Sequence, residues 1–500
     1  MNTFKKVICC VLVALLLLSA CACGTGTEKE TQGETQGELT SKIDSEIVTK
    51  ETLDIPDTRY DGEELVFLTR DEGEWSSTSI FAEREDISED PISDAVYTRN
   101  DKIYQQYGVT IKEYKETTKN MSTKVQTEIS APTGDFQAVV SNVAVAANMS
   151  GNGYIWDLYS EETSNLDLSK SWWDQKFVEG FNIEGRVFFA TGDLLTLDND
   201  ATFAMLFNKT IAAECQIPDL YSMVSNYEWT FDKMYEYEVL ATNDSNGNGK
   251  LDYNNDVAGF AITGDVPYCM FYAGGLCVIA KDEEGSLSFG LNVERAQNVA
   301  DSAKRIFDKE HVVNMSEIAI SEFSGDMPAV NQACFGEGHA LFFSEVLQSV
   351  TRLRGSDVDF GVIPFPMYDT NQNAYYHMMH GTGSVVSIPR SVEKDIEMVS
   401  AMIEAMAYYS VDTLTKQYYE INLTTKSVKD EQSGPMIDLI LASRVCDLGY
   451  YYGWGNAVGT FVSALNPNSN TSVASSAKSL ERVVNKQISN ALKKFDDNYT

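Results

Sequence analysis

The chain has 500 residues, of which 43% are hydrophobic, and its formal net charge is −36. This length allows two or three domains of roughly 150 residues each, and the apolar share suits a globular core. A surface this acidic repels nucleic acid and anionic lipid head groups, and it favours neutral or cationic ligands.

The first twenty residues have the layout of an export signal. Lys5 and Lys6 precede an apolar run at 7–18, which Leu18-Ser19-Ala20-Cys21 closes. The run is too short to cross a bilayer, which needs about 20 apolar residues. Its last four residues resemble a bacterial lipobox, which implies cleavage after Ala20 and a lipid on Cys21. We therefore expect residues 1–20 to be a lipoprotein signal peptide.

Two other interpretations of this segment stay open. A plain secretory signal can end beside an incidental cysteine, and Cys23 is a weaker lipidation site because Cys21 would then occupy its small-residue position. Residues 21–60 are expected to be a flexible tether, since they repeat Thr-Gln-Gly-Glu and contain almost no aromatic residues. The predicted location is the cell membrane, with the protein lipid-anchored on the extracellular side.

From residue 61 onward, short apolar runs alternate with stretches of helical spacing. The apolar runs predict strands at 65–68, 109–111, 136–140, 185–190, 202–207, 260–262 and 360–363. The helical spacing predicts helices at 94–107, 231–241, 396–409 and 474–495. Strands that alternate with helices indicate an α/β fold with helices on the faces of a sheet.

Five local motifs follow one another in a recognisable order. They are Phe207-Asn208-Lys209 after a strand, Trp229-Thr230-Phe231-Asp232 at a helix start, and the runs 335–341, 361–366 and 383–389. After a lipobox, this series resembles the family 1, sugar-type extracellular solute-binding proteins of bacterial ABC importers. The resemblance implies a periplasmic-binding-protein-like α/β fold over 61–500. It would have two lobes, each discontinuous in sequence, with a hinge and a ligand cleft between them.

The resemblance also implies a function. Such a protein is not an enzyme; it captures a carbohydrate, here an oligosaccharide, and the lobes close because ligand binds the closed state better. The closed complex then docks on the permease subunits of an ABC transporter. Nucleic acid is not an expected partner.

A calcium-like loop follows the helix predicted at 231–241. Asp244, Asn246, Asn248 and Asp252 occupy loop positions 1, 3, 5 and 9, with a glycine at position 6 and the Lys250 carbonyl at position 7. Position 12 holds Asn255 instead of a bidentate Glu, and Asp256 comes one place late. We expect a structural Ca²⁺ site of modest affinity at these residues. The alternative is an Asn/Gly-rich turn that binds no ion.

Candidate ligand contacts follow from the chemistry of sugar sites, which combine aromatic faces with polar side chains. The aromatic candidates are Trp75 after the first strand, the adjacent Trp172 and Trp173, and Trp454. At most one of the adjacent pair is expected to stack on ligand, because neighbouring strand residues face opposite ways. The polar candidates are Asp193, Asn199 and Asp200. Core packing or loop solvation is the alternative for each of these residues.

Other metal and disulfide chemistry has little support in the sequence. The cysteines beyond the anchor are odd in number and far apart, so we expect free thiols, at Cys215, Cys269, Cys277, Cys334 and Cys446. A pair between Cys269 and Cys277 is the alternative. His377 and His380 lack the Glu of a zinc motif, so no zinc site is expected there.

Three rival functions remain open at this stage. A secreted glycan-active enzyme would need two suitably spaced carboxylates, which so acidic a chain can always offer, but no Gly-x-Ser-x-Gly, His-Glu-x-x-His or P-loop motif is present. A sensor-linked or adhesive binding protein would share the fold without an importer. Within the importer interpretation, peptides or polyamines remain possible ligands.

Overall fold

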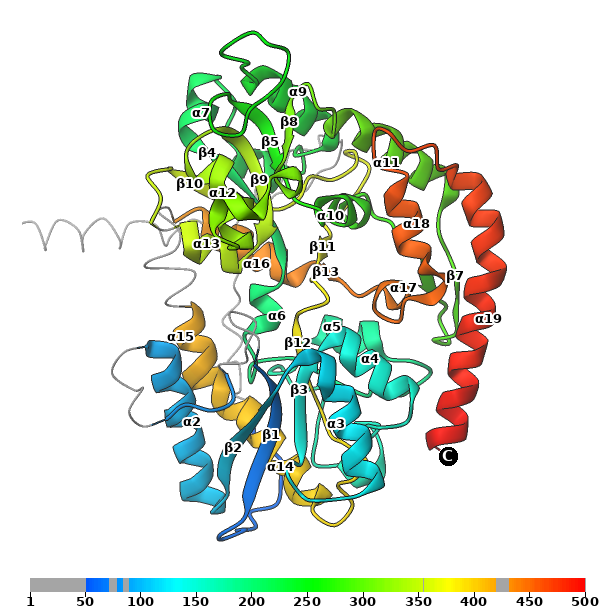
Figure 1. Cartoon of the computed structure of the whole chain (residues 1–500). Coiled ribbons are helices and arrows are strands. Elements are labelled where there is room, and N and C mark those ends of the chain that lie inside the picture. Colours follow the sequence, from blue (N-terminus) through cyan, green and yellow to red (C-terminus); the bar gives the residue numbers. More distant parts are fainter. Residues whose placement is uncertain (1–50, 72–78, 84–89, 354, 420–430, 500) are drawn as a thin grey trace, which may run out of the picture. The chain divides into compact units, whose positions relative to one another are not determined.

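The computed structural model describes residues 51–71, 79–83, 90–353, 355–419 and 431–499. The predicted signal peptide, Cys21 and most of the predicted tether lie outside these residues, as does Trp75. No helix among the described residues has the length and apolarity needed to cross a bilayer. The described chain contains two main β-sheets with helices packed against them (Figure 1).

The first sheet has the strand order β12-β3-β1-β2. Its strands are β1 (Glu64–Arg70), β2 (Thr110–Glu116), β3 (Ala138–Asn142) and β12 (Ser384–Ser387). β1 runs parallel to β2 and β3, whereas β12 runs antiparallel to β3. We call this sheet and the helices packed on it lobe 1.

Two helices of lobe 1 illustrate why the sequence folds locally as it does. Helix α2 (Pro91–Tyr107) starts where Asp90 accepts the N–H of Ser93 at 3.0 Å, and it ends at Gly108, whose φ of 76° is a left-handed cap. Helix α14 (Ile396–Ser410) is buried on nearly all sides, including Ser400 and Glu404, so it is a core helix and not a surface one.

The second sheet has the order β10-β4-β9-β5-β8. Its strands are β4 (Phe203–Asn208), β5 (Ala258–Ile262), β8 (Val312–Asn314), β9 (Ala340–Val346) and β10 (Phe360–Ile363). β5 runs parallel to β8 and β9, and β4 runs antiparallel to β9 and β10. Every residue of β4, β5 and β10 is buried, as expected for strands covered on both faces. We call this sheet and its helices lobe 2.

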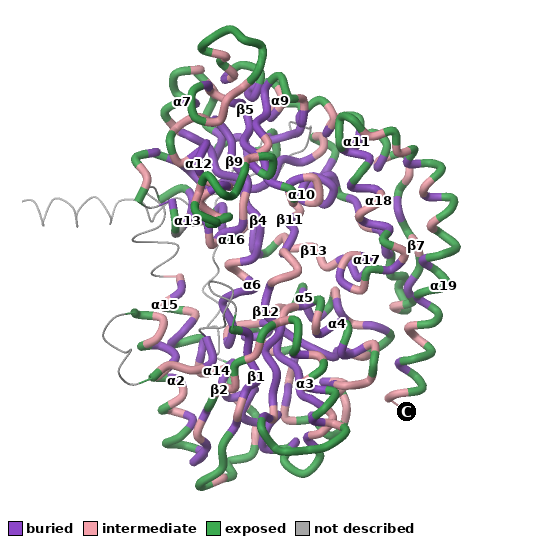
Figure 2. The backbone as a smooth tube through the Cα atoms, in the orientation of Figure 1, coloured by how far each residue is buried: buried purple, intermediate pink, exposed green. Residues whose placement is uncertain are grey.

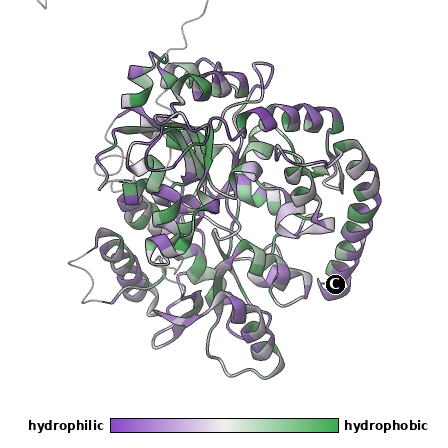
Figure 3. Ribbon diagram, turned by 45° about the horizontal axis from the view of Figure 1, so that its top comes forward, coloured by the Kyte–Doolittle hydropathy of each residue, from purple (hydrophilic) through white to green (hydrophobic). Residues whose placement is uncertain are grey.

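Burial and hydropathy follow this layered arrangement. Figure 2 shows the strands of both sheets in the buried colour and the outer side of the long C-terminal helix exposed. Figure 3 shows hydrophobic residues concentrated in the strands of lobe 2 and hydrophilic residues on the surrounding helices and loops. Two separate two-stranded sheets are also present. One pairs β6 (Ile279–Lys281) with β7 (Leu287–Phe289), and the other pairs β11 (His377–Met378) with β13 (Arg444–Val445).

The remaining helices cover the sheets and connect them. Those before β9 are α3 (Thr118–Ser130), α4 (Val143–Gly151), α5 (Gln175–Phe181), α6 (Leu197–Asp200), α7 (Lys209–Glu214), α8 (Leu220–Ser225), α9 (Phe231–Ala241), α10 (Val266–Ala273), α11 (Val293–Ile306) and α12 (Met327–Gly336). Those after it are α13 (Gln348–Leu353), α15 (Lys416–Tyr419), α16 (Ser433–Ala442), α17 (Leu448–Tyr451), α18 (Ala457–Ser463) and α19 (Val473–Tyr499). Single turns are η3 (Glu161–Thr163), η4 (Met315–Glu317), η5 (Ile320–Phe323), η6 (Val411–Thr415) and η8 (Trp454–Asn456).

The chain passes between the lobes more than once. It leaves lobe 1 after β3, enters lobe 2 at β4, and returns to lobe 1 between β10 and β12. The two crossing segments touch, because Thr202 forms a bridge with Met379 and His380 donates its backbone N–H to the carbonyl of Ala201 at 2.8 Å. These contacts locate the hinge region that the sequence alone did not place.

Helix α19 contacts both lobes along its length. Near its middle, Asn485 accepts the backbone N–H of Phe289 in β7 at 2.8 Å. Near its end, the ring of Phe495 stacks on Phe188 with centroids 4.9 Å apart, and Asp496 pairs with Arg186 at 2.9 Å. The C-terminal helix is therefore a further connection between the lobes, beside the crossing segments.

Most predicted elements are present with shifted ends. The helix at 231–241 has the predicted bounds as α9, and those at 396–409 and 474–495 are α14 and α19. The strand predicted at 185–190 is wrong, because Glu184 and Gly185 form a turn with positive φ and only isolated bridges follow. Residues 51–60, part of the predicted tether, contact the body: Glu51 accepts the N–H and hydroxyl of Ser171 at 2.9 and 2.6 Å.

Candidate functional site

The first candidate cavity lies at the end of β9 and has a volume of about 240 Å³; we call it the β9 cavity. Its lining comes from the start of β4, the end of β9, α12, α13 and a crossing segment: Phe203, Asp265, Met327, Pro328, Asn331, Glu345, Val346, Gln348, Ser349, Arg352 and His380. β5 and β9 are parallel, so their carboxyl ends reach the same edge of the sheet. Open α/β sheets bind ligands at that edge.

Two acidic side chains, Asp265 and Glu345, line the β9 cavity and can accept hydrogen bonds. Asn331 donates its side-chain N–H to Oε2 of Glu345 at 2.8 Å, and burial raises the pKa of Glu345 above its ordinary value. The side chain of Asp265, just beyond β5, is 46% exposed. A partly buried carboxylate and a more accessible one therefore face the same cavity.

His380 supplies a neutral imidazole to this cavity. Burial lowers its pKa, and the nearby charge of Asp265 only partly opposes that effect. The backbone N–H of Thr382 lies 3.3 Å from Nδ1 and donates to it, so the neutral ring carries its proton on Nε2. Nε2 lies 4.0 Å from Oδ1 of Asp265. The cavity thus offers a ring N–H donor beside carboxylate and amide groups, a combination suited to hydroxyl groups.

An aromatic pair lies beside the same carboxylate. Tyr268 of α10 and Tyr450 of α17 meet edge to face with ring centroids 5.8 Å apart, and neither ring is fully buried. Burial and the charge of Asp265 raise the pKa of the Tyr450 phenol, which therefore stays neutral. Tyr450 also lines a second cavity.

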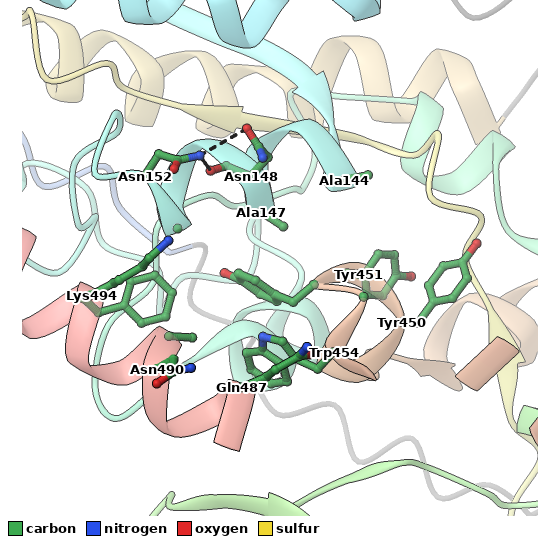
Figure 4. Close-up of a pocket in the computed structure, with 15 residues that line it drawn as sticks. Ala144, Ala147, Asn148, Asn152, Tyr450, Tyr451, Trp454, Gln487, Asn490 and Lys494 are labelled. Atoms are coloured by element: carbon green, nitrogen blue, oxygen red, sulfur yellow. Dashed lines mark hydrogen bonds between the residues drawn. The ribbon is translucent and has the colours of Figure 1, made fainter. Parts of the chain in front are cut away.

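The second cavity lies between α4 and α19 and has a volume of about 500 Å³; we call it the α19 cavity (Figure 4). Trp454, one of the predicted ligand residues, lines it from η8 and is 6% exposed. Its ring stacks on Tyr452 with centroids 5.2 Å apart, and the Tyr452 hydroxyl lies 3.0 Å from that of Ser150. Trp454 therefore packs mainly in the core, although it lines this cavity.

A third cavity, of about 520 Å³, gathers four other predicted ligand residues: Trp172, Trp173, Asp193 and Asn199. We call it the crossing cavity, because α6 of the first crossing segment lines it. Both tryptophans are 2% exposed, and they donate their indole N–H groups to the two oxygens of Glu404, each at 2.9 Å. Both rings therefore pack in the core, whereas the sequence allowed one of them to stack on ligand.

The polar residues around the crossing cavity form an internal network. Arg444 pairs with Asp174 and, at 3.3 Å, with Asp198, and it donates to Oδ1 of Asn199 at 3.1 Å. Asp193 accepts from the hydroxyl of Thr415 at 2.8 Å. These side chains are occupied with one another, which favours a structural role for Asp193 and Asn199 in the hinge region.

Asp200, the last polar candidate, is also engaged. It accepts from the Tyr418 hydroxyl at 2.8 Å, and burial raises its pKa to about 7. Burial likewise raises the pKa values of Asp193 and Asp198 to about 6. Several carboxylates, of which Asp198 is buried, thus lie around the first crossing segment, and Arg444 is the cation that pairs with two of them. Trp75 lies outside the described residues and stays a prediction.

The calcium-like loop has its oxygen atoms turned toward its own backbone. Asp244 accepts N–H groups from Gly247 at 2.8 Å and Gly249 at 2.7 Å, and Asn246 and Asn248 accept from residues two places ahead. Asp256 is buried and accepts from Ser245 and from the backbone of Asp252 at 2.8 Å. This places Asp256 as the residue that closes the loop, while Asn255 stays exposed.

The cysteine thiols and His377 show no sign of a disulfide or a zinc site among the described residues. All five described cysteines are free, so the Cys269–Cys277 pair is absent from this structure. His377 is buried, accepts the N–H of Phe365 at 3.0 Å and contacts the Ser443 hydroxyl at 2.7 Å. The described residues hold no group of three or more His, Cys, Asp or Glu side chains arranged for a metal ion.

The sequence analysis missed Asp265, Asn331, Glu345 and His380 as ligand candidates. One signal was available for Asp265, because it comes three residues after the predicted strand at 260–262, where a carboxyl-edge loop begins. Glu345 carried no such signal, since it lies inside β9 as that strand reaches the edge.

Comparisons with known proteins were made for the sequence and for the fold. No protein-family model matches the chain, and no curated protein matches it. The fold is similar to the cyclic α-maltosyl-1,6-maltose-binding protein of Arthrobacter globiformis, with TM-score 0.56 and 12% identity over 85% of this chain and 99% of that one.

Two further solved structures have the same fold. One is an ABC substrate-binding protein from Listeria monocytogenes in complex with cycloalternan, with TM-score 0.52, 14% identity, and 86% and 100% of the two chains covered. The other is the maltose/maltodextrin-binding domain from Bdellovibrio bacteriovorus bound to maltotriose, with TM-score 0.51, 13% identity, and 85% and 100% covered. The chain therefore has the two-lobed α/β fold of periplasmic solute-binding proteins, which confirms the fold class predicted from its motifs.

Proposed function

We propose that this protein is a lipid-anchored extracellular solute-binding protein that captures an oligosaccharide between its lobes and delivers it to an ABC permease. The observation that carries the proposal is the group Asp265, Asn331, Glu345 and His380 at the carboxyl edge of the lobe 2 sheet. The three similar structures described above are binding proteins for glucose-based oligosaccharides by their names, and this supports the ligand class.

A neutral polyol fits this group better than a charged ligand does. Carboxylates accept hydrogen bonds from hydroxyl groups, and the Asn331 amide can both accept and donate them. The neutral His380 ring adds a further donor. The half-buried Tyr268 and Tyr450 beside Asp265 offer aromatic edges and faces for the C–H surface of a sugar. A peptide would instead need paired sites for its backbone, and a polyamine would need several accessible carboxylates beside the aromatic pair.

A glycan-active enzyme is the second candidate, and one observation favours it. Glu345 has a raised pKa and shares its cavity with Asp265, as the acid and its partner do in glycoside hydrolases. Against it, Asn331 and the backbone N–H of Val346 both donate to Glu345, which fixes that carboxyl in place as an acceptor. Binding without turnover is therefore our proposal.

The anchor and the metal belong to the same proposal. Lipidation at Cys21 would hold the protein at the membrane, facing outward, which a solute-binding protein needs in order to reach its permease. A Ca²⁺ ion would replace the backbone N–H groups that now occupy Asp244, Asn246 and Asn248, with Lys250 and Asp252 as further ligands and Asp256 closing the loop.

A thermal-shift screen with a turnover assay tests the function. The mature lipidated chain in detergent is heated with oligosaccharides, peptides and polyamines at constant Ca²⁺. A ligand at 100 times its dissociation constant adds about 2.7 kcal/mol to the free energy of unfolding. A shift with one glycan series and no hydrolysis of it supports the proposal. Hydrolysis would establish the enzyme, and a shift with peptides or polyamines alone would refute the sugar ligand.

A further inference from the structure

The described lining of the α19 cavity contains no acidic residue, which is unusual in so acidic a protein. Fifteen residues line it and none is acidic, although 74 of the chain's 500 residues are Asp or Glu. The other two cavities do contain carboxylates, at Asp265 and Glu345 in one and at Asp174, Asp193, Asp198 and Asp438 in the other. Among the residues that the structure describes, Lys494 is the only charged one that lines the α19 cavity.

Lys494 has no ionic partner among the described residues. Figure 4 shows its side chain extending from α19 toward the end of α4 that carries Asn152. The nearest acidic residues along the helix do not neutralise it, since Asp496 pairs with Arg186 at 2.9 Å and Asp497 forms no ion pair with a described residue. The ammonium group is exposed at the cavity, so it can meet an anion without first losing a protein partner.

The remaining polar groups of the α19 cavity add donors. The indole N–H of Trp454 donates to no described residue, and the Asn490 side chain likewise has no hydrogen bond within the described chain. Asn152 also lines the cavity, but its amide N–H already donates to the backbone of Asn148 at 2.8 Å. Donor groups and one cation, with no carboxylate, favour an acceptor-rich, anionic ligand over a cationic one.

From this lining we infer that the α19 cavity takes an anionic sugar residue, with the carboxylate of a uronic acid or the sulfate of a sulfated sugar paired to Lys494. The inference rests on the proposed function and narrows its substrate class to acidic oligosaccharides. The cavity volume of about 500 Å³ is within the usual range for ligand sites. Tyr450 lines this cavity and is close enough to Asp265 of the β9 cavity to feel its charge.

The large negative net charge of the protein does not prevent an anionic sugar from binding at Lys494. At physiological ionic strength, interactions between exposed charges are largely screened beyond about 8 Å. The acid-free lining therefore determines the local potential more than the net charge of −36 does. A single exposed ion pair contributes little, so the expected preference for the anionic ligand is about two- to fivefold and falls as salt is added.

Matched ligands test the inference by calorimetry on the mature lipidated chain in detergent with Ca²⁺ present. Each pair differs at one position of the sugar: oligomers of galacturonate and galactose, of glucuronate and glucose, and sulfated and unsulfated galactose oligomers. We expect one acidic member to bind about two- to fivefold tighter than its neutral partner at 50 mM NaCl and less so at 300 mM. Which acidic arm binds distinguishes a carboxylate from a sulfate ligand.

Variants then assign the effect to one side chain. Lys494→Gln is expected to remove the preference while leaving the affinity for the neutral oligomer unchanged, which also shows that the variant is folded. Lys493→Gln changes the adjacent exposed lysine, which does not line the cavity, and is expected to behave as the parent protein does.

The remaining outcomes count against the inference. Neutral oligomers that bind as tightly as the acidic ones, or a preference that survives Lys494→Gln, would overturn it and leave the proposed function standing. Failure of every glycan to bind would overturn the proposed function together with the inference.

Discussion

Trp173 donates its indole N–H to Oε2 of Glu404, and its neighbour Trp172 donates to Oε1, each at 2.9 Å. A single carboxyl group on α14 therefore binds both tryptophan rings. The sequence had allowed one of these rings to stack on a sugar. Burial raises the pKa of Glu404 to about 7, although the two indole donors lower it. The clamp between Glu404 and the two tryptophans ties residues 172–173 to the core of lobe 1.

Glu404→Gln is expected to change how stability depends on pH. The folded carboxyl titrates near 7 and the unfolded one near 4.5, so the folded state binds more protons between these values. The contribution of Glu404 to the free energy of unfolding therefore falls as pH rises through this window, by up to about 3 kcal/mol. Urea denaturation at pH 5, 6.5 and 8 measures it: the parent should lose stability relative to the variant as pH rises.

The exposed Glu397 of the same helix provides the control for this experiment. Glu397→Gln should leave the pH dependence as it is in the parent protein. Parallel curves for the parent and Glu404→Gln would show that Glu404 keeps an ordinary pKa, and the prediction would be wrong.

Arg444→Gln is expected to destabilise the protein by about 3 to 5 kcal/mol at pH 8, because it leaves Asp174 and Asp198 buried without their cation. The loss should shrink at pH 5, where Asp198, with a pKa of about 6, can take up a proton. Arg305→Gln removes a well-exposed pair with Asp232 and should cost less than about 1 kcal/mol. Equal losses for the two variants in urea denaturation would contradict a buried network at Arg444.

Asp265→Asn and Glu345→Gln are expected to weaken binding of the oligosaccharide found in the screen by about 10- to 100-fold each. A hydrogen bond to a charged group contributes about 1.5 to 3 kcal/mol, and both carboxylates line the β9 cavity. Calorimetry measures the affinity, and Glu283→Gln removes an exposed carboxylate elsewhere as the control. Unchanged affinity in both variants would place the ligand outside the β9 cavity.

Calcium is expected to raise the melting temperature by a few degrees at 1 mM, and a chelator should reverse the rise. Asp244→Asn should abolish the effect, because Asp244 occupies the first ligand position of the proposed calcium loop. Asp282→Asn is a matched control, since Asp282 also accepts two backbone N–H groups in a turn but lacks the spacing of a calcium loop. A rise that persists in Asp244→Asn would mean that Ca²⁺ binds elsewhere.

The regular elements were largely predictable because they depend on local pattern. The helical spacing of apolar residues predicted α9 with its observed bounds, and α14 and α19 within a few residues of theirs. The strand predicted at 185–190 failed because an apolar run also suits an extended segment that lies in the core without pairing fully. The helix α10 was missed because it is apolar on all sides and shows no helical period.

The candidate site was predictable only in part. Four of the predicted ligand residues do lie around one cavity, but their partners, Glu404 and Arg444, come from far along the chain and turn them inward. Adjacent tryptophans look the same in sequence whether a sugar or a buried carboxyl holds them. The spacing of residues along the chain contains no information on which of these it is.

By itself, the sequence predicted an export signal with a lipobox, an acidic surface, the alternating α/β pattern and the spacing of the calcium-like loop, because each depends on residues close together in the chain. The tertiary structure alone decided which side chains share a cavity. Asp265, Asn331, Glu345 and His380 meet because the parallel strands end at one edge and a crossing segment returns there. Lys494 faces an acid-free cavity because α19 packs beside α4, a contact between segments more than 300 residues apart in the sequence.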